Sequence, residues 1–110
     1  MASQQGTVDY IVEQARGAGD VHAKRMFGEY GLYCRGKMVA LVCDDELFVK
    51  PTAGGRAHAG ALDEKPPYAG AKPCLVIPGE RWDEDDWLAE LFRISAAELP
   101  APVKTRRARP

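Results

Sequence analysis

The chain has 110 residues, of which 45% are hydrophobic and 28% are charged. This length supports one compact domain with a single core and is short for two. No apolar run approaches the ~20 residues that span a bilayer, and fifteen Lys and Arg against sixteen Asp and Glu leave a net charge of −1. The composition therefore argues against a membrane protein, a disordered chain and a polycation that coats nucleic acid. The first ten residues lack the features of a signal peptide, so we expect a cytoplasmic protein with no membrane partner.

Three cysteines, Cys34, Cys43 and Cys74, stand far apart in the sequence and form no CxxC pair. An odd number at such spacing is typical of reduced thiols in a reducing compartment. A structural zinc site needs four ligands, usually in two close pairs, and only His22 and His58 could join the thiols. We therefore expect buried, inert cysteines and no metal site.

Charge is unevenly distributed along the chain. Residues 100–110 contain four cations and no acid, which leaves eleven cations against sixteen acids, a net charge of −5, in residues 1–99. The four cations are Lys104, Arg106, Arg107 and Arg109. Because this segment also holds three prolines and shows no apolar periodicity, the sequence predicts a domain over residues 1–99 followed by a disordered basic tail.

The N-terminal half predicts one helix and then several strands. Thr7 can cap a helix over about residues 8–17, in which the apolar residues recur at helical spacing. From Val21 onward, short runs rich in β-branched and aromatic residues are separated by glycines or acidic turns. The runs are VHAKRMF, GLYC, KMVALVC and LFVK. They predict a meander of three or four antiparallel strands.

A turn at residues 35–36 predicts how the two central strands pair. The expected pairs are Cys34 with Lys37, Tyr33 with Met38, Leu32 with Val39, and Tyr30 with Leu41. Alternation along the strands then assigns residues to two faces. The expected core face holds Tyr30, Leu32, Val39, Leu41 and Cys43, joined by Leu47 and Val49 if the turn at residues 44–46 has three residues. The opposite face holds Tyr33, Met38, Ala40, Val42, Phe48 and Lys50.

The C-terminal half is less regular. Residues 51–73 are interrupted by glycine and proline and allow one short helix at about 56–62. Residues 74–77, CLVI, predict a strand, and residues 83–93 predict a helix with an apolar stripe. The stripe consists of Trp87, Leu88, Leu91 and Phe92, and Ser95 with Glu98 could cap one further turn. Together the elements predict an α+β domain, an antiparallel sheet of about five strands with helices on one side, in the order α-β-β-β-(α)-β-β-α.

Residues 24–50, KRMFGEYGLYCRGKMVALVCDDELFVK, resemble the signature of the N-terminal domain of the TfoX/Sxy family, the regulators of bacterial competence. The matching residues are Arg25, Met26, Phe27, Gly28, Tyr30, Gly31, Leu32, Tyr33, Gly36, Lys37, Met38, Ala40, Leu41, Leu47 and Lys50. Pro78 and Trp87 also stand where the family tends to place a proline and a last amphipathic helix. The sequence departs from the family at Glu29, where a small residue is common, and in the glycine- and proline-rich residues 51–67.

The resemblance implies an α+β fold and neither catalytic residues nor a cofactor. Full competence regulators add a C-terminal domain, so we expect this chain to correspond to their first domain standing alone. We expect a non-catalytic protein-interaction domain. Its partner would be another protein or a second copy of the chain, as a homodimer. The expected contact residues are Tyr33, Met38, Phe48 and Lys50, on the face turned away from the helices.

Three alternatives stay open. Residues 51–73 could fold over the opposite face and complete the core. The tail cations Lys104, Arg106, Arg107 and Arg109 could make weak, sequence-independent contacts with nucleic acid, or the domain could bind a small molecule or be an unrecognised enzyme. The acidic clusters at residues 44–46 and 83–86 are interpreted as a solvated turn and a helix start, and His22 as an exposed strand residue.

Overall fold

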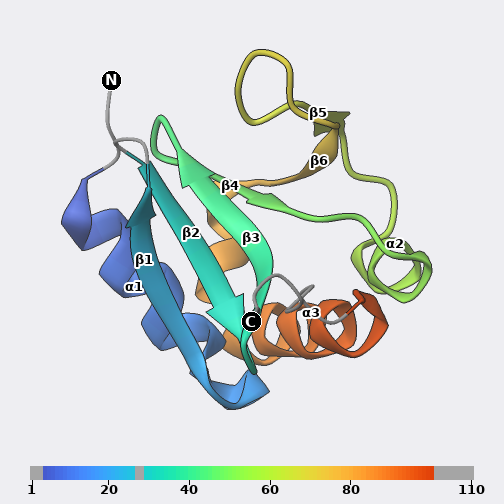
Figure 1. The fold of residues 1–110 in the computed structure, drawn as a ribbon. Coiled ribbons are helices and arrows are strands. Elements are labelled where there is room, and N and C mark those ends of the chain that lie inside the picture. The colour runs from blue at the N-terminus through green and yellow to red at the C-terminus, as the bar shows by residue number, and fades with distance from the viewer. Residues whose placement is uncertain (1–3, 27–28, 101–110) are drawn as a thin grey trace, which may run out of the picture.

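The computed structural model describes residues 4–26 and 29–100, which form three helices and a six-stranded antiparallel sheet (Figure 1). In chain order the elements are α1 (Gln5–Ala15), the 3₁₀ turn η1 (Arg16–Ala18), β1 (Val21–Met26), β2 (Glu29–Cys34), β3 (Lys37–Cys43), β4 (Glu46–Val49), α2 (Ala53–Ala59), β5 (Glu64–Lys65), β6 (Cys74–Ile77), the 3₁₀ turn η2 (Gly79–Asp83) and α3 (Asp85–Glu98). The strand order is β1-β2-β3-β4-β6-β5. The predicted fold class is confirmed, with four strands before α2 and two after it.

The sheet has one face covered by α1 and α3, which we call the inner face (Figure 1). Val8, Ile11 and Ala15 of α1 are buried there, and so are Leu88, Leu91 and Phe92 of α3. The sheet contributes the inner-face side chains of Tyr30, Leu32, Cys34, Val39, Ala40, Val42, Leu47, Val49, Leu75 and Ile77. Burial of this set supplies the main hydrophobic stabilisation of the domain.

The predicted helices differ from the observed ones mainly at their ends. α1 begins at Gln5, and Gln4 rather than Thr7 is its N-cap. α3 begins two residues later than predicted and continues through the expected extra turn to Glu98. Asp85 and Asp86 lie in its first turn, where negative charge favours the helix dipole.

α2 lies within the least regular part of the sequence, and its start is set by a side-chain cap. The Thr52 hydroxyl accepts a hydrogen bond from the Gly55 N–H at 2.9 Å. α2 packs on α3, where Gly54 donates its N–H to the Glu98 carboxylate at 2.9 Å. No helix within residues 4–26 and 29–100 combines the length and the apolar character needed to cross a membrane.

The pairing of β2 with β3 departs from the predicted register. The two pairs next to the turn are confirmed, but Leu32 pairs with Ala40 instead of Val39. Val39 is therefore an extra residue, a β-bulge, and the strand shifts by one position beyond it. Regular alternation, on which the prediction rests, fails at this one residue.

The bulge changes the face of four side chains. Ala40 and Val42, predicted for the face away from the helices, lie on the inner face. Leu41 and Cys43, predicted for the core face, lie on the opposite side, which we call the outer face. Leu47 and Val49 still reach the inner face because a second error cancels the first: the β3–β4 turn has two residues and not three.

Candidate functional site

A hollow of about 560 Å³ opens on the outer face of the sheet, and we call it the outer hollow. Its volume falls in the range of ~300–1,000 Å³ that is usual for ligand sites. Most of its lining is apolar, and two acidic residues contribute to it. The lining residues are Met26, Glu29, Tyr30, Met38, Leu41, Cys43, Asp44, Pro67 and Tyr68.

Gly31, in the middle of β2, leaves room for two methionines that line the outer hollow. A Cβ atom at this position would lie 2.9 Å from the Sδ atoms of both Met26 and Met38. A glycine within a strand often marks such a close approach. The two thioethers thus pack across bare backbone, and their flexible side chains can adapt to an incoming group.

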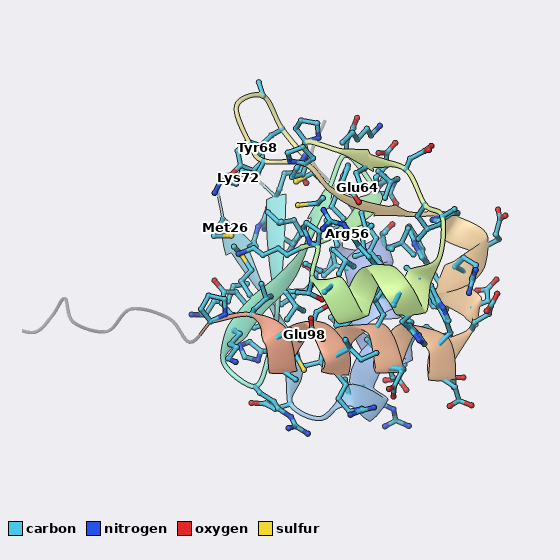
Figure 2. The ribbon with its side chains drawn as sticks, turned by 90° about the vertical axis from the view of Figure 1, so that its right-hand side faces the viewer. Met26, Arg56, Glu64, Tyr68, Lys72 and Glu98 are labelled. Atoms are coloured by element: carbon cyan, nitrogen blue, oxygen red, sulfur yellow. The ribbon has the colours of Figure 1, made fainter. Side chains whose placement is uncertain are left out.

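The cover of the outer hollow comes from the loop between β5 and β6. Pro67 and Tyr68 line the hollow from this loop, and Figure 2 shows Tyr68 on the loop above Met26. Tyr68 is 59% exposed, the highest exposure among the large hydrophobic residues described. The C-terminal part of residues 51–73 therefore covers the outer face only in part, and contact of the rest with a partner stays a prediction.

Phe48 does not contribute to an exposed contact surface. It is 2% exposed, in a small outer-face cluster with Leu41, Cys43 and Cys74. The Lys65 ammonium lies 6.0 Å from the centre of its ring and also pairs with a carboxylate of β4. The expectation that Phe48 lies exposed as a contact residue is thus corrected, because the ring is buried in this cluster with the Lys65 ammonium against it.

The other three predicted contact residues lie together. Tyr33, Met38 and Lys50 line a depression of about 320 Å³ next to the outer hollow, with Gly36, Lys37, Leu99 and Pro100. Met38 lines both concavities and so joins them. The predicted tail residues Lys104, Arg106, Arg107 and Arg109 lie outside the described residues, and nucleic-acid contact by them stays a prediction.

Two comparisons with known proteins identify the family of this chain. The model of the TfoX N-terminal domain matches residues 13–99. The chain belongs to the TfoX N-terminal domain family. It is also 38% identical over 109 residues to an uncharacterized 12.7 kDa protein in the trpE 5′ region of Spirochaeta aurantia, covering 99% of this chain and 93% of that protein.

Two signature residues of this TfoX N-terminal domain have clear structural roles. Lys37, at the start of β3, donates from Nζ to the carbonyl oxygens of Ala96 and Leu99, both at 2.8 Å. It thereby satisfies carbonyls at the C-terminus of α3 and joins that helix to the sheet. Gly31 makes room for the two methionines of the outer hollow. Phe27 and Gly28, also in the signature, lie outside the described residues.

The three cysteines of this TfoX N-terminal domain are free and buried. Burial raises the pKa of Cys43 to about 11, and burial also raises the pKa of Cys34 and of Cys74. Because the thiolate is the nucleophilic form, these thiols are poor nucleophiles at neutral pH. The cysteine that lines the outer hollow, Cys43, is therefore mainly protonated at neutral pH.

Both histidines stack on aromatic rings. The His22 ring stacks on Tyr33, and the His58 ring stacks on Trp87 and lies with Nε2 3.1 Å from the Trp87 carbonyl oxygen. Among residues 4–26 and 29–100, no three His, Cys, Asp or Glu side chains are grouped to hold a metal ion. The TfoX N-terminal domain is not a known enzyme family.

Sequence reasoning missed Pro67, Tyr68 and the pairing of Met26 with Met38. The useful signal was a glycine inside a strand with methionines nearby in sequence, which indicates close packing over that glycine. Nothing in the sequence pattern indicated where the proline-containing loop would lie. Its position depends on the pairing of β5 with β6, and β5 has only two residues.

Proposed function

We propose that this chain is a non-catalytic protein-interaction domain, and that the outer face of its sheet pairs with a second copy of the chain. The observation that carries the proposal is the outer hollow, an apolar concavity of about 560 Å³. Methionine-lined hollows suit apolar side chains of a protein partner. The family also includes competence regulators, which supports a regulatory role for such a contact.

Charges on the outer face support pairing with a second copy. Carboxylates of Glu29 and Asp44 line the outer hollow, and Lys50 lines the adjoining depression. In a two-fold pair every contact is repeated in reverse. An axis near Met38 would place the hollow of each copy against the depression of the other, with carboxylates opposite lysine.

The test is the oligomeric state measured by sedimentation equilibrium. Met38→Asp places a charge where the two concavities meet and should convert a wild-type dimer into a monomer. Tyr68→Ser, at an exposed position, should weaken the dimer without affecting folding. Tyr10→Ser serves as the matched control, since Tyr10 is 41% exposed on α1, an element that covers the inner face.

A wild-type chain that stays monomeric at millimolar concentration would contradict self-association through this face. A dimer that persists in both Met38→Asp and Tyr68→Ser would place the contact elsewhere. Circular dichroism of each variant shows whether loss of the dimer reflects loss of the fold.

A further inference from the structure

The two edges of the sheet differ in length and in charge. The β5 edge has two residues, whereas β1 pairs with β2 over six consecutive residues without a bulge. β1 forms the outermost strand on its side, as Figure 1 shows, and no strand within residues 4–26 and 29–100 pairs with its outer edge. A regular edge of this length is a template for another extended segment.

The register identifies which backbone groups of β1 point outward. The Arg35 N–H donates to the Asp20 carbonyl at 2.9 Å, directly before the strand. Hydrogen-bonded pairs alternate along an antiparallel ladder, so the residues at 22, 24 and 26 bond to β2. The N–H and C=O groups of Val21, Ala23 and Arg25 therefore point away from the sheet.

Exposed cations flank this edge on both faces of the sheet. Lys24, on the outer face, lies with its ammonium 5.3 Å from the centre of the Tyr33 ring. Arg25, on the inner face, lies with its guanidinium carbon 5.6 Å from the centre of the Tyr30 ring. Both rings belong to β2, so each cation is held close to the sheet by an attractive contact.

The charge at the edge selects its partner. Residues 1–99 carry a net charge of −5, yet β1 places two adjacent exposed cations, Lys24 and Arg25, two residues after the exposed His22. If two copies paired through β1, these cations would face one another across the new ladder, which disfavours a second copy. An extended segment with adjacent acidic residues would instead place one carboxylate on each face of the sheet.

The geometry points to β1 as a strand-addition site for an extended acidic segment of a partner protein. The outward groups of Val21, Ala23 and Arg25 supply main-chain hydrogen bonds, and Lys24 and Arg25 supply charge pairing. β1 adjoins the outer hollow through Met26, but strand addition uses the outward edge of β1 and does not depend on self-association through the hollow.

The probe is a short peptide with blocked ends, in which valine and threonine alternate around a central Glu-Asp pair. Its binding to the wild-type chain is measured by fluorescence anisotropy at low salt. A Gln-Asn version of the peptide should bind about tenfold more weakly, because surface ion pairs contribute modestly and additively. Equal binding of both peptides would overturn the charge selection.

Two variants separate charge from backbone pairing. The double variant Lys24→Glu and Arg25→Glu should lose the acidic peptide and gain a Lys-Arg version of it, while Arg93→Glu on α3 is the matched control and should change neither. Ala23→Pro removes an outward N–H without removing a bond to β2, and proline is tolerated at sheet edges. It should weaken binding about tenfold, and unchanged affinity would overturn strand addition.

Hydrogen exchange tests the same proposal on the wild-type chain, so its result does not depend on whether a variant folds. On adding the acidic peptide to the wild-type chain, the amides of residues 21, 23 and 25 should become protected, while those at 22 and 24 should stay as they were. Peptide binding without this alternating protection would overturn strand addition.

Discussion

The two faces of the sheet are built from alternate residues of the same strands, yet they are covered in different ways. On the inner face, α1 and α3 bury Leu32, Val42 and Phe92 completely. On the outer face, a four-residue cluster has the Lys65 ammonium of β5 against its phenylalanine ring, and a hollow of about 560 Å³ remains beside it. The comparison indicates that the elements packed against each face decide how completely its apolar residues are buried, so that one face is a core and the other keeps a hollow.

The largest expected effect comes from truncating the inner face. Phe92 is fully buried between α3 and the sheet, and Phe92→Ala should cost about 3–5 kcal/mol of unfolding free energy. Urea denaturation followed by circular dichroism measures it. An unchanged denaturation midpoint would contradict the central position of α3.

Phe48→Ala is the matched outer-face variant, since Phe48 is 2% exposed. We expect Phe48→Ala to cost about 3 kcal/mol of unfolding free energy, at the lower end of the same range. The neighbouring hollow lets nearby side chains relax into the cavity that the substitution leaves. A cost larger than that of Phe92→Ala would show that the outer cluster is the better-packed core.

Glycine substitutions should give an intermediate effect that differs between the two regions. A Cβ atom at Gly54 would lie 2.8 Å from Cγ2 of Ile94 and would also displace the Glu98 carboxylate. Gly54→Ala should therefore cost about 1–3 kcal/mol by overpacking against α3. Gly31→Ala displaces only the ends of two flexible methionines and should change stability by less than about 1 kcal/mol. Thermal unfolding of the pair measures the difference, and equal costs would contradict it.

The two faces should differ least in the reactivity of their thiols, because all three cysteines are buried. Cys43 and Cys74 are 5% and 6% exposed on the outer face, whereas Cys34 is fully buried on the inner face. Iodoacetamide should therefore modify the outer pair first, with mass spectrometry of the peptides as the readout. Since the pKa of Cys43 is raised to about 11, its rate should rise with pH from neutral until that value.

The unfolded chain in denaturant is the control for this experiment, because its three thiols should react at similar rates. Faster modification of Cys34 than of Cys43 in the folded chain would contradict the assignment of the faces.

Local patterns predicted most of the fold. Helical spacing in α1 and α3, and strand runs bounded by turns, predicted the elements and their order, because each depends on residues near one another in sequence. Arg35 and Gly36 both have positive φ, the conformation that a two-residue hairpin turn requires, so the pairs next to that turn were predicted correctly.

The candidate site was less predictable, because it depends on packing between distant segments. Tyr68 lines the hollow from the loop that follows the two-residue strand β5. Lys65, on β5 itself, lies against the Phe48 ring. Trp87, part of the predicted apolar stripe, is only half-buried, with the Arg81 guanidinium carbon 3.9 Å from its ring centre and His58 stacked on it. Neither partner could be paired with Trp87 from periodicity.

The bulge in β3 also bears on how this domain can vary in length. Val39 is one residue more than β2 requires, since Met38 and Ala40 already face consecutive residues of that strand. A single deletion at the bulge would leave the pairs on both sides intact and would remove one buried side chain. In β2 or β4 the same loss would exchange the two faces of the strand. We therefore expect β3 to be the strand of this sheet that best tolerates the loss of a residue.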